Sequence, residues 1–364
     1  MKKQEIIWLL SAVLSLSAAV FLGMEWEKKL IINPQGQRDI GYSQSSGEYY
    51  AQANKPQLKL TFQKLSTPGG MAQQQMQPRA NLGSEQSAAQ KIYSDEDNFY
   101  AYYKFTNFKR DSLSINYSMS KSQYKSLVAT YGYKASEMQN MSNSHKQERS
   151  QIWNDNLPKG EAAAKRALKI SDDEYETKLR AYLYSRGLAL RGSQKTIEPD
   201  VPNIVRKNKD LMKKVAVDIN SVATENGYTS EDIVGTVLSF VQTALVYRQP
   251  PMIEKNGVHT VGIFPPFRAI LTGWGDCDTK SALAASILGN WKNIKLVGIS
   301  VPNHYLMAIR RMPVQGDMYI TYKDSSYVLV EPAGPAWLPP GSVAEKTKTL
   351  LAGREHYIIE PILQ

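Results

Sequence analysis

The order of the apolar patterns after residue 202 limits the fold of this chain more than any other feature of its sequence. Apolar residues recur there at helical spacing, and Gly227 is placed to end the first helix. The two apolar faces are Leu211, Val215, Ile219 and Val222, then Ile233, Val237, Leu238, Val241 and Leu245. A third helix is predicted over 277–288, and strand-like runs follow at 294–300, 304–309, 318–322 and 327–330. Helices followed by antiparallel strands indicate the α+β class.

The amino-terminal segment predicts a membrane anchor over residues 1–24. Residues 6–23 are apolar and uncharged, Lys2 and Lys3 precede them, and no clear cleavage triplet follows. We therefore expect a single-pass anchor with the body outside the cytoplasm, in the periplasm or the extracellular space. Secretion after signal cleavage is the alternative.

The composition changes twice between this segment and residue 201. Residues 25–57 are typical of a linker, and 58–135 predict a small β-rich region with a low-complexity stretch and strand patterns at 58–65, 99–108 and 111–119. Residues 136–200 are helical in pattern, and Ser171 with the acidic residues after it resembles a helix N-cap. The helices and strands described first then form a last domain, 201–364.

Charge and cysteine usage exclude several function classes. The chain has 44 Lys and Arg against 34 Asp and Glu, a formal net charge of +10. A solvated basic surface is the favoured explanation of this excess, and an anionic lipid or a wall polymer held by the amino-terminal half is the alternative. No signature of a nucleic-acid-binding motif accompanies the charge, so no nucleic acid is expected. One cysteine and four scattered histidines exclude an intrachain disulfide and a thiolate zinc cluster. We expect no metal or cofactor.

The single cysteine stands where a nucleophile could be activated. Cys277 follows a Gly-x-Gly-Asp turn and opens the helix predicted over 277–288. The free N–H groups and the dipole of a helix amino terminus stabilise a thiolate, so we expect a moderately lowered thiol pKa. Asp276 and Asp278 oppose that effect. The alternative is a small buried cysteine without chemistry.

Attack by a thiolate on a carbonyl needs a base and a group that orients the base. His304 begins one predicted strand, and Glu331 ends another. If these two strands pair antiparallel, the two residues become neighbours at one edge of the sheet. This arrangement requires that residues 314–324 do not lie between them.

Several segments together resemble the transglutaminase-like superfamily of bacterial cysteine enzymes. They are Gly275-Asp276-Cys277-Asp278-Thr279-Lys280-Ser281, Asn303-His304-Tyr305, Tyr327-Val328-Leu329-Val330-Glu331-Pro332 and Phe240-Val241-Gln242. The resemblance covers about 202–361. It implies a papain-like core, in which a helix bearing the cysteine packs on an antiparallel sheet bearing the histidine and the acid.

The same resemblance implies roles for four residues. Cys277 would be the nucleophile, His304 the general base and acid, Glu331 the group that orients His304, and Gln242 a side-chain oxyanion donor. A polar residue on a core-facing helix is the alternative for Gln242. Arg268 and Thr279 depart from the family pattern, because many relatives carry a carboxylate at these two positions.

These expectations combine into an enzyme of the cell envelope that attacks an amide in a peptide or protein through an acyl-thioester on Cys277. Hydrolysis, as by a cysteine peptidase or amidase, is favoured over crosslinking because water is abundant and no amine-selecting site is visible. The alternatives are a protein-crosslinking transglutaminase and a degenerate domain that serves as a binding or scaffold module.

Overall fold

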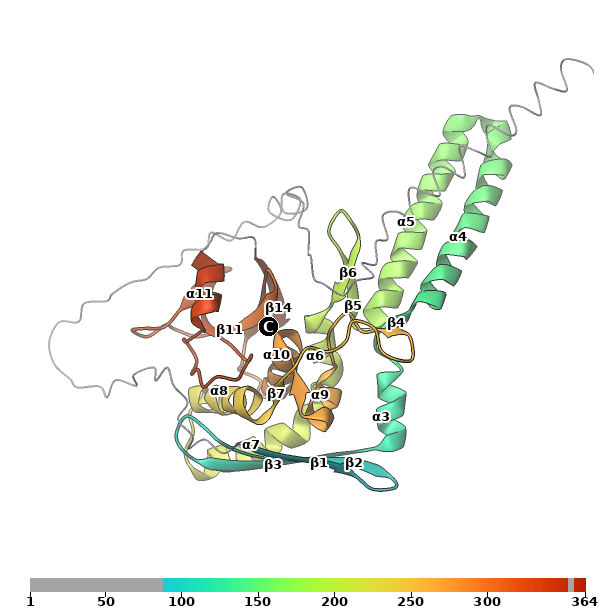
Figure 1. Cartoon of the computed structure of the whole chain (residues 1–364). Helices are drawn as coiled ribbons and strands as arrows, with labels where there is room; N and C mark the ends of the chain where they lie inside the picture. The colour runs from blue at the N-terminus through green and yellow to red at the C-terminus, as the bar shows by residue number, and fades with distance from the viewer. Residues whose placement is uncertain (1–87, 353–356) are drawn as a thin grey trace, which may run out of the picture. The chain divides into compact units, whose positions relative to one another are not determined.

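The computed structural model describes residues 88–352 and 357–364. The predicted anchor, the linker and the strand pattern at 58–65 lie outside these residues. Within the described residues, no helix is long and apolar enough to cross a membrane. The chain divides into two compact units, of which one comprises 132–199 with 253–261 and the other 88–131, 200–252 and 262–364. Helices and strands both contribute (Figure 1), and the predicted α+β class is confirmed.

An antiparallel sheet forms the carboxyl-terminal half of the larger unit. Its strands lie in the order β12-β13-β11-β10-β14. Their bounds are Leu296–Val301 (β10), His304–Arg310 (β11), Tyr319–Tyr322 (β12), Ser325–Val330 (β13) and Ile358–Leu363 (β14). Both faces are covered: Met307 lies in the main core, and its neighbour Leu306 lies in a smaller cluster with Leu351 of α11 (Glu345–Ala352). Burial on both faces explains the continuous apolar runs in these strands.

One face of this sheet packs against helices. They are α6 (Val201–Asn208), α7 (Lys213–Glu225), α8 (Ser230–Ser239), α9 (Pro266–Thr272) and α10 (Cys277–Leu288). Thr229 caps α8 through a reciprocal capping box with Asp232, and Gly227 follows α7 with a left-handed φ of 64°. Every residue of α10 is buried, because α10 contacts β11 as well as α6, α8 and α9. The helices predicted around α7, α8 and α10 are confirmed.

A second sheet belongs to the same core. It contains β1 (Ala89–Ser94), β2 (Asn98–Thr106) and β3 (Ser112–Ser120), and α3 (Lys121–Val128) follows it. Its inner face carries Tyr103 and Phe105, whose rings contact the ring of Phe240, a residue of the π-helical turn Phe240–Ala244 after α8. The sequence predicts these strands as a region of their own; in the structure they share one core with the cysteine-bearing helix.

The smaller unit is built on a helical hairpin. Its helices are α4 (Ala135–Asn156) and α5 (Glu161–Ser185), and its short strands are β4 (Tyr133–Lys134), β5 (Leu188–Arg191), β6 (Thr196–Pro199) and β8 (Val258–His259). The prediction of an N-cap at Ser171 is wrong, because Ser171 is buried inside α5. The acidic residue next to it, Asp172, instead pairs with His145 and Arg149 of α4.

Candidate active site

Cys277 is the first residue of α10, and the turn before it is fixed by close packing. Asp276 caps the helix by accepting a hydrogen bond from the backbone N–H of Thr279 at 3.2 Å. Gly275 has no room for a side chain, since a Cβ there would lie 2.4 Å from the methyl group of Thr279. Thr279 also accepts a hydrogen bond from the N–H of Phe264 at 3.2 Å. It therefore holds the start of the cysteine helix against the segment before α9.

His304 and Glu331 meet as the strand pairing predicts. β11 pairs antiparallel with β13, and β12 lies on the outer side of β13, so residues 314–324 do not separate the two strands. The Nε2–H of His304 donates to Glu331 Oε1 at 2.8 Å. This bond leaves Nδ1 as the ring nitrogen that could exchange a proton with a thiol.

The Glu331 carboxylate is held from two further directions. It is 5% exposed and accepts hydrogen bonds from Thr347 Oγ1 at 2.9 Å and from the N–H of Ala344 at 2.8 Å. Burial acts to raise the pKa of Glu331, but the hydrogen bonds from His304, Ala344 and Thr347 outweigh it, so the pKa lies below its usual value. The acid is therefore ionised at neutral pH and suited to orient an imidazole.

The thiol of Cys277 lies at the beginning of β11. Its Sγ–H donates to Asp278 Oδ1 at 3.3 Å, and the sulfur accepts a hydrogen bond from the backbone N–H of Tyr305, the residue after His304. The side chain of Tyr247 lies near enough to the thiol for the two groups to interact. No hydrogen bond joins the side chains of Cys277 and His304 in the described part of the chain. The structure thus brings the cysteine to the strand that carries the histidine.

The expectation of a lowered thiol pKa is wrong for this arrangement. Burial raises the pKa of Cys277 well above its usual value, and the charges of Asp278 and Asp276 raise it further. The N–H of Tyr305 acts in the opposite direction and is outweighed. The thiol of Cys277 is therefore neutral at rest, and a base would have to take its proton before the sulfur could attack a substrate.

Replacing Asp278 by asparagine is expected to speed the alkylation of native Cys277 by iodoacetamide. Removing this charge lowers the pKa of the thiol. If the pKa falls by about 1, the fraction of thiolate at about pH 7.5 rises about tenfold. The rate is measured by mass spectrometry, and no other cysteine interferes. Asp218→Asn, in the ion pair with Lys214 on α7, is the matched control and should react like the wild type. An unchanged rate in the Asp278 variant would contradict this electrostatic account.

Gln242 is held by main-chain groups. Its Nε2 donates to the carbonyl oxygens of Glu331 at 2.8 Å and Leu338 at 3.0 Å, and its Oε1 accepts from the N–H of Leu338 at 2.9 Å. Both amide hydrogens are therefore in use, which does not support the prediction of an oxyanion donor. The segment 331–338 also lies close to the helical turn Phe240–Ala244, because a Cβ on Gly334 would lie 2.2 Å from the carbonyl oxygen of Gln242. Gln242 fixes the chain that follows Glu331.

Gln242→Ala is accordingly expected to lower the free energy of unfolding by about 3 kcal/mol, because buried carbonyl and N–H groups of the 331–338 segment lose their partners. Thr243→Ala is the control, since Thr243 makes one local hydrogen bond, to Ser239, and is partly exposed. Urea unfolding measures both. If Gln242→Ala were as stable as the wild type but lost most of its turnover, Gln242 would again be the candidate oxyanion donor.

Tyr247 and Lys280 also lie near the thiol, and the sequence assigns a role to neither of them. β7 (Val246–Tyr247) pairs with β9 (Trp274–Gly275), which sets Tyr247 opposite Gly275. Burial, and then the charges of Cys277 and its acidic neighbours, raise the pKa of Tyr247 to about 12. Lys280, on the turn of α10 after Cys277, is fully buried; its Nζ donates to the carbonyl of Leu245 at 2.8 Å, and burial lowers its pKa to about 7. The sequence shows Lys280 only as part of the motif around Cys277, and its complete burial is what distinguishes it in the structure.

The described residues contain no group of three or more His, Cys, Asp or Glu side chains placed to hold a metal ion. Arg268 packs its guanidinium over the ring of Phe264, 3.8 Å from the ring centroid. Comparison with family models, with curated proteins and with solved structures finds no significant match for this chain.

Proposed function

We propose that this chain is a transglutaminase-like cysteine hydrolase that attacks an amide bond through an acyl-thioester on Cys277. The observation that carries the proposal is the placement of three groups at one end of β11. The His304–Glu331 hydrogen bond lies there, and the N–H of the next residue, Tyr305, contacts the thiol. The helix that begins with Cys277 packs on the same strand, as a papain-like core requires.

The reaction would proceed from the neutral thiol. His304 Nδ1 takes the thiol proton as the sulfur attacks the carbonyl carbon, and the imidazolium gives that proton to the leaving amine. Water then attacks the thioester with the same imidazole as base, which releases the acid and restores the thiol. Glu331 keeps the proton on Nε2 throughout, so that Nδ1 can act as the base.

A donor for the developing oxyanion is also needed, and Tyr247 is placed to provide it. Its side chain lies near the thiol, and its hydroxyl stays protonated at neutral pH, because its pKa is about 12. It therefore takes the role that the sequence assigns to Gln242. The N–H groups at the start of α10 would add to it.

The substrate and the location belong to the same proposal. An amide in a peptide or protein of the cell envelope follows from the predicted anchor at residues 1–24, and hydrolysis is favoured over glutamine–lysine crosslinking. One observation favours a second candidate, a binding or scaffold module: Cys277 is 3% exposed and has a raised pKa. An idle thiol would have both properties.

Mass spectrometry of envelope peptides from cells with the wild type and with Cys277→Ala separates these candidates. A hydrolase is expected to produce new peptide termini or deamidated side chains that are absent from the variant. Glutamine–lysine isopeptides that depend on Cys277 would establish the crosslinking alternative instead. Identical peptide sets, together with electrophile labelling that is indifferent to His304→Ala, would leave the scaffold module.

A further inference from the structure

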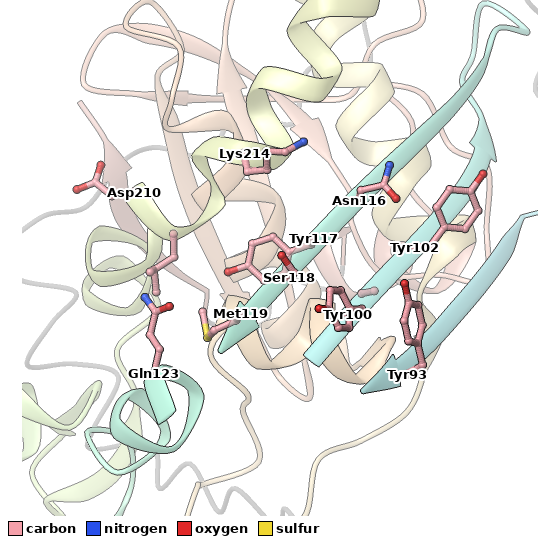
Figure 2. Close-up of a pocket in the computed structure, with 12 residues that line it drawn as sticks. Tyr93, Tyr100, Tyr102, Asn116, Tyr117, Ser118, Met119, Gln123, Asp210 and Lys214 are labelled. Carbon is pink, nitrogen blue, oxygen red and sulfur yellow. The ribbon is translucent and has the colours of Figure 1, made fainter. Parts of the chain in front are cut away.

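The outer face of the three-stranded sheet carries tyrosines that the core does not use. Along β2, Tyr103 and Phe105 point into the core, and the alternation sends Tyr100 and Tyr102 to the other face. The register of β1 with β2 sets Tyr93 directly opposite Tyr100. Figure 2 shows these rings side by side on the sheet. Aromatic side chains grouped on a solvent-facing surface commonly mark a binding site.

The tyrosine rings are held in position before any ligand arrives. Tyr93 and Tyr100 stack with centroids 5.0 Å apart and an angle of 13° between the planes. The Tyr100 hydroxyl donates to Asp95 Oδ2 at 2.7 Å, and Asp95 is fixed in turn by two backbone N–H groups of the β1–β2 turn. Tyr102 shares a hydrogen bond with Ser114 at 3.1 Å. Such rings lose little conformational entropy on binding.

A cavity of about 450 Å³ lies beside the rings. This volume falls within the range of small-ligand pockets. Besides the tyrosines, its lining includes Asn116 and Ser118 of β3, Gln123 of α3, and the oppositely charged Asp210 and Lys214. Figure 2 shows these polar groups around the cavity. The site therefore combines aromatic surface with amide and hydroxyl groups and has no net charge.

This chemistry selects among ligand classes. A single-stranded nucleic acid would need an excess of positive charge along its backbone, and the single lysine of the lining already pairs with Asp218. A neutral sugar matches better. The C–H groups of a pyranose face carry partial positive charge that suits the negative face of an aromatic ring, and its hydroxyls suit carboxamides.

We propose that this pocket binds a neutral glycan, with a pyranose ring against Tyr100 and Tyr102 and hydroxyl or acetamide groups bonded to Asn116 and Gln123. The site shares no residue with the Cys277 site. It gives the chain a means of holding a polysaccharide independently of the proposed hydrolase activity. This binding would not depend on the chain's excess of Lys and Arg, because the pocket itself has no net charge.

Isothermal titration with chitohexaose and with cellohexaose tests the proposal on the full chain. At least one of the two is expected to bind with a Kd of about 1 mM or tighter. Tyr100→Ala and Asn116→Ala should each weaken binding roughly tenfold or more, through loss of the ring face or of the amide. Tyr184→Ala, at an exposed tyrosine of α5, is the matched control and should bind like the wild type.

Further measurements keep the result interpretable. Tyr100→Phe keeps the ring and loses only the bond to Asp95, so it should bind better than Tyr100→Ala even if the alanine variant is less stable. Cys277→Ala should bind normally, which separates this proposal from the enzymatic one. Failure of both hexasaccharides to bind at about 10 mM would overturn it. The proposal would also be overturned if oligo(dT) displaced the hexasaccharide and itself lost affinity at high salt, because that result would indicate a nucleic-acid site.

Discussion

Glu331→Gln is expected to slow acylation of Cys277 by roughly 10²–10⁴-fold while the chain stays folded. The carboxylate accepts from His304 Nε2, from Thr347 and from the N–H of Ala344. A carboxamide has one acceptor oxygen, and if Ala344 takes it, the NH₂ group faces the imidazole. Nε2 must then accept, the ring proton moves to Nδ1, and Nδ1 can no longer take the thiol proton.

Release of p-nitrophenolate from p-nitrophenyl acetate measures this rate without knowledge of the natural substrate. Thr347→Val is the matched control: it removes one hydrogen bond to Glu331 Oε1 but leaves the bond to His304, so it should cost less than about tenfold. Thermal unfolding checks that both variants fold. A Glu331→Gln variant within a few-fold of the wild type would show that the imidazole does not depend on this acid.

Lys280→Met is expected to stabilise the protein at pH 7 by on the order of 3 kcal/mol. Burial lowers the pKa of Lys280 from 10.5 to about 7. Between these two pKa values, Lys280 carries a proton in the unfolded chain and does not carry it in the folded chain. The stability of the wild type should therefore be lowest at and below about pH 7 and rise by about 1.4 kcal/mol per pH unit above it. Methionine fills the space without a titrating group, and it loses the bond to Leu245 and the contact of the amine with the Tyr247 ring, 5.9 Å from the ring centroid.

Urea unfolding at about pH 7, 7.5 and 8 tests this prediction, because free thiols and tyrosines titrate above that range. The wild type should gain stability with pH and Lys280→Met should not. Lys214→Met removes an exposed lysine and should keep the slope of the wild type. Parallel pH profiles for the wild type and Lys280→Met would show that the buried amine is charged when folded.

The sequence predicts those parts of the fold in which periodicity and caps agree. α7 and α8 have apolar residues at helical spacing, and α10 has a capping residue before it and a glycine after it. The strands β10 to β13 are recognisable as short apolar runs. β1 and β14 are not predicted. β1 is exposed along its whole length, and β14 is interrupted by Glu360 and Pro361, so neither has a buried pattern of its own. These two segments become strands because they pair with β2 and β10, respectively.

The site is predictable to a similar extent. The meeting of His304 with Glu331 follows from the direction of two strands, which sequence patterns can indicate. The ionisation of Cys277 does not follow, because it depends on how deeply the thiol and its two neighbouring carboxylates are buried. The helix dipole is local and visible in the sequence, whereas desolvation is a property of the packed core. The partners of Gln242 lie about a hundred residues away and are equally hidden.

The larger unit is interrupted in the chain by residues 132–199, and this affects how it can be made. The Tyr103 hydroxyl donates to the carbonyl of Ile270, 167 residues later, and Asn107 bonds to Tyr228 across 121 residues. While the ribosome synthesises the inserted hairpin, the apolar inner face of β2 and β3 has no partner to bury it. Contacts this distant form slowly and leave strands open to aggregation in the meantime. The core around the cysteine-bearing helix can therefore close only after the stretches on both sides of the inserted hairpin have been synthesised.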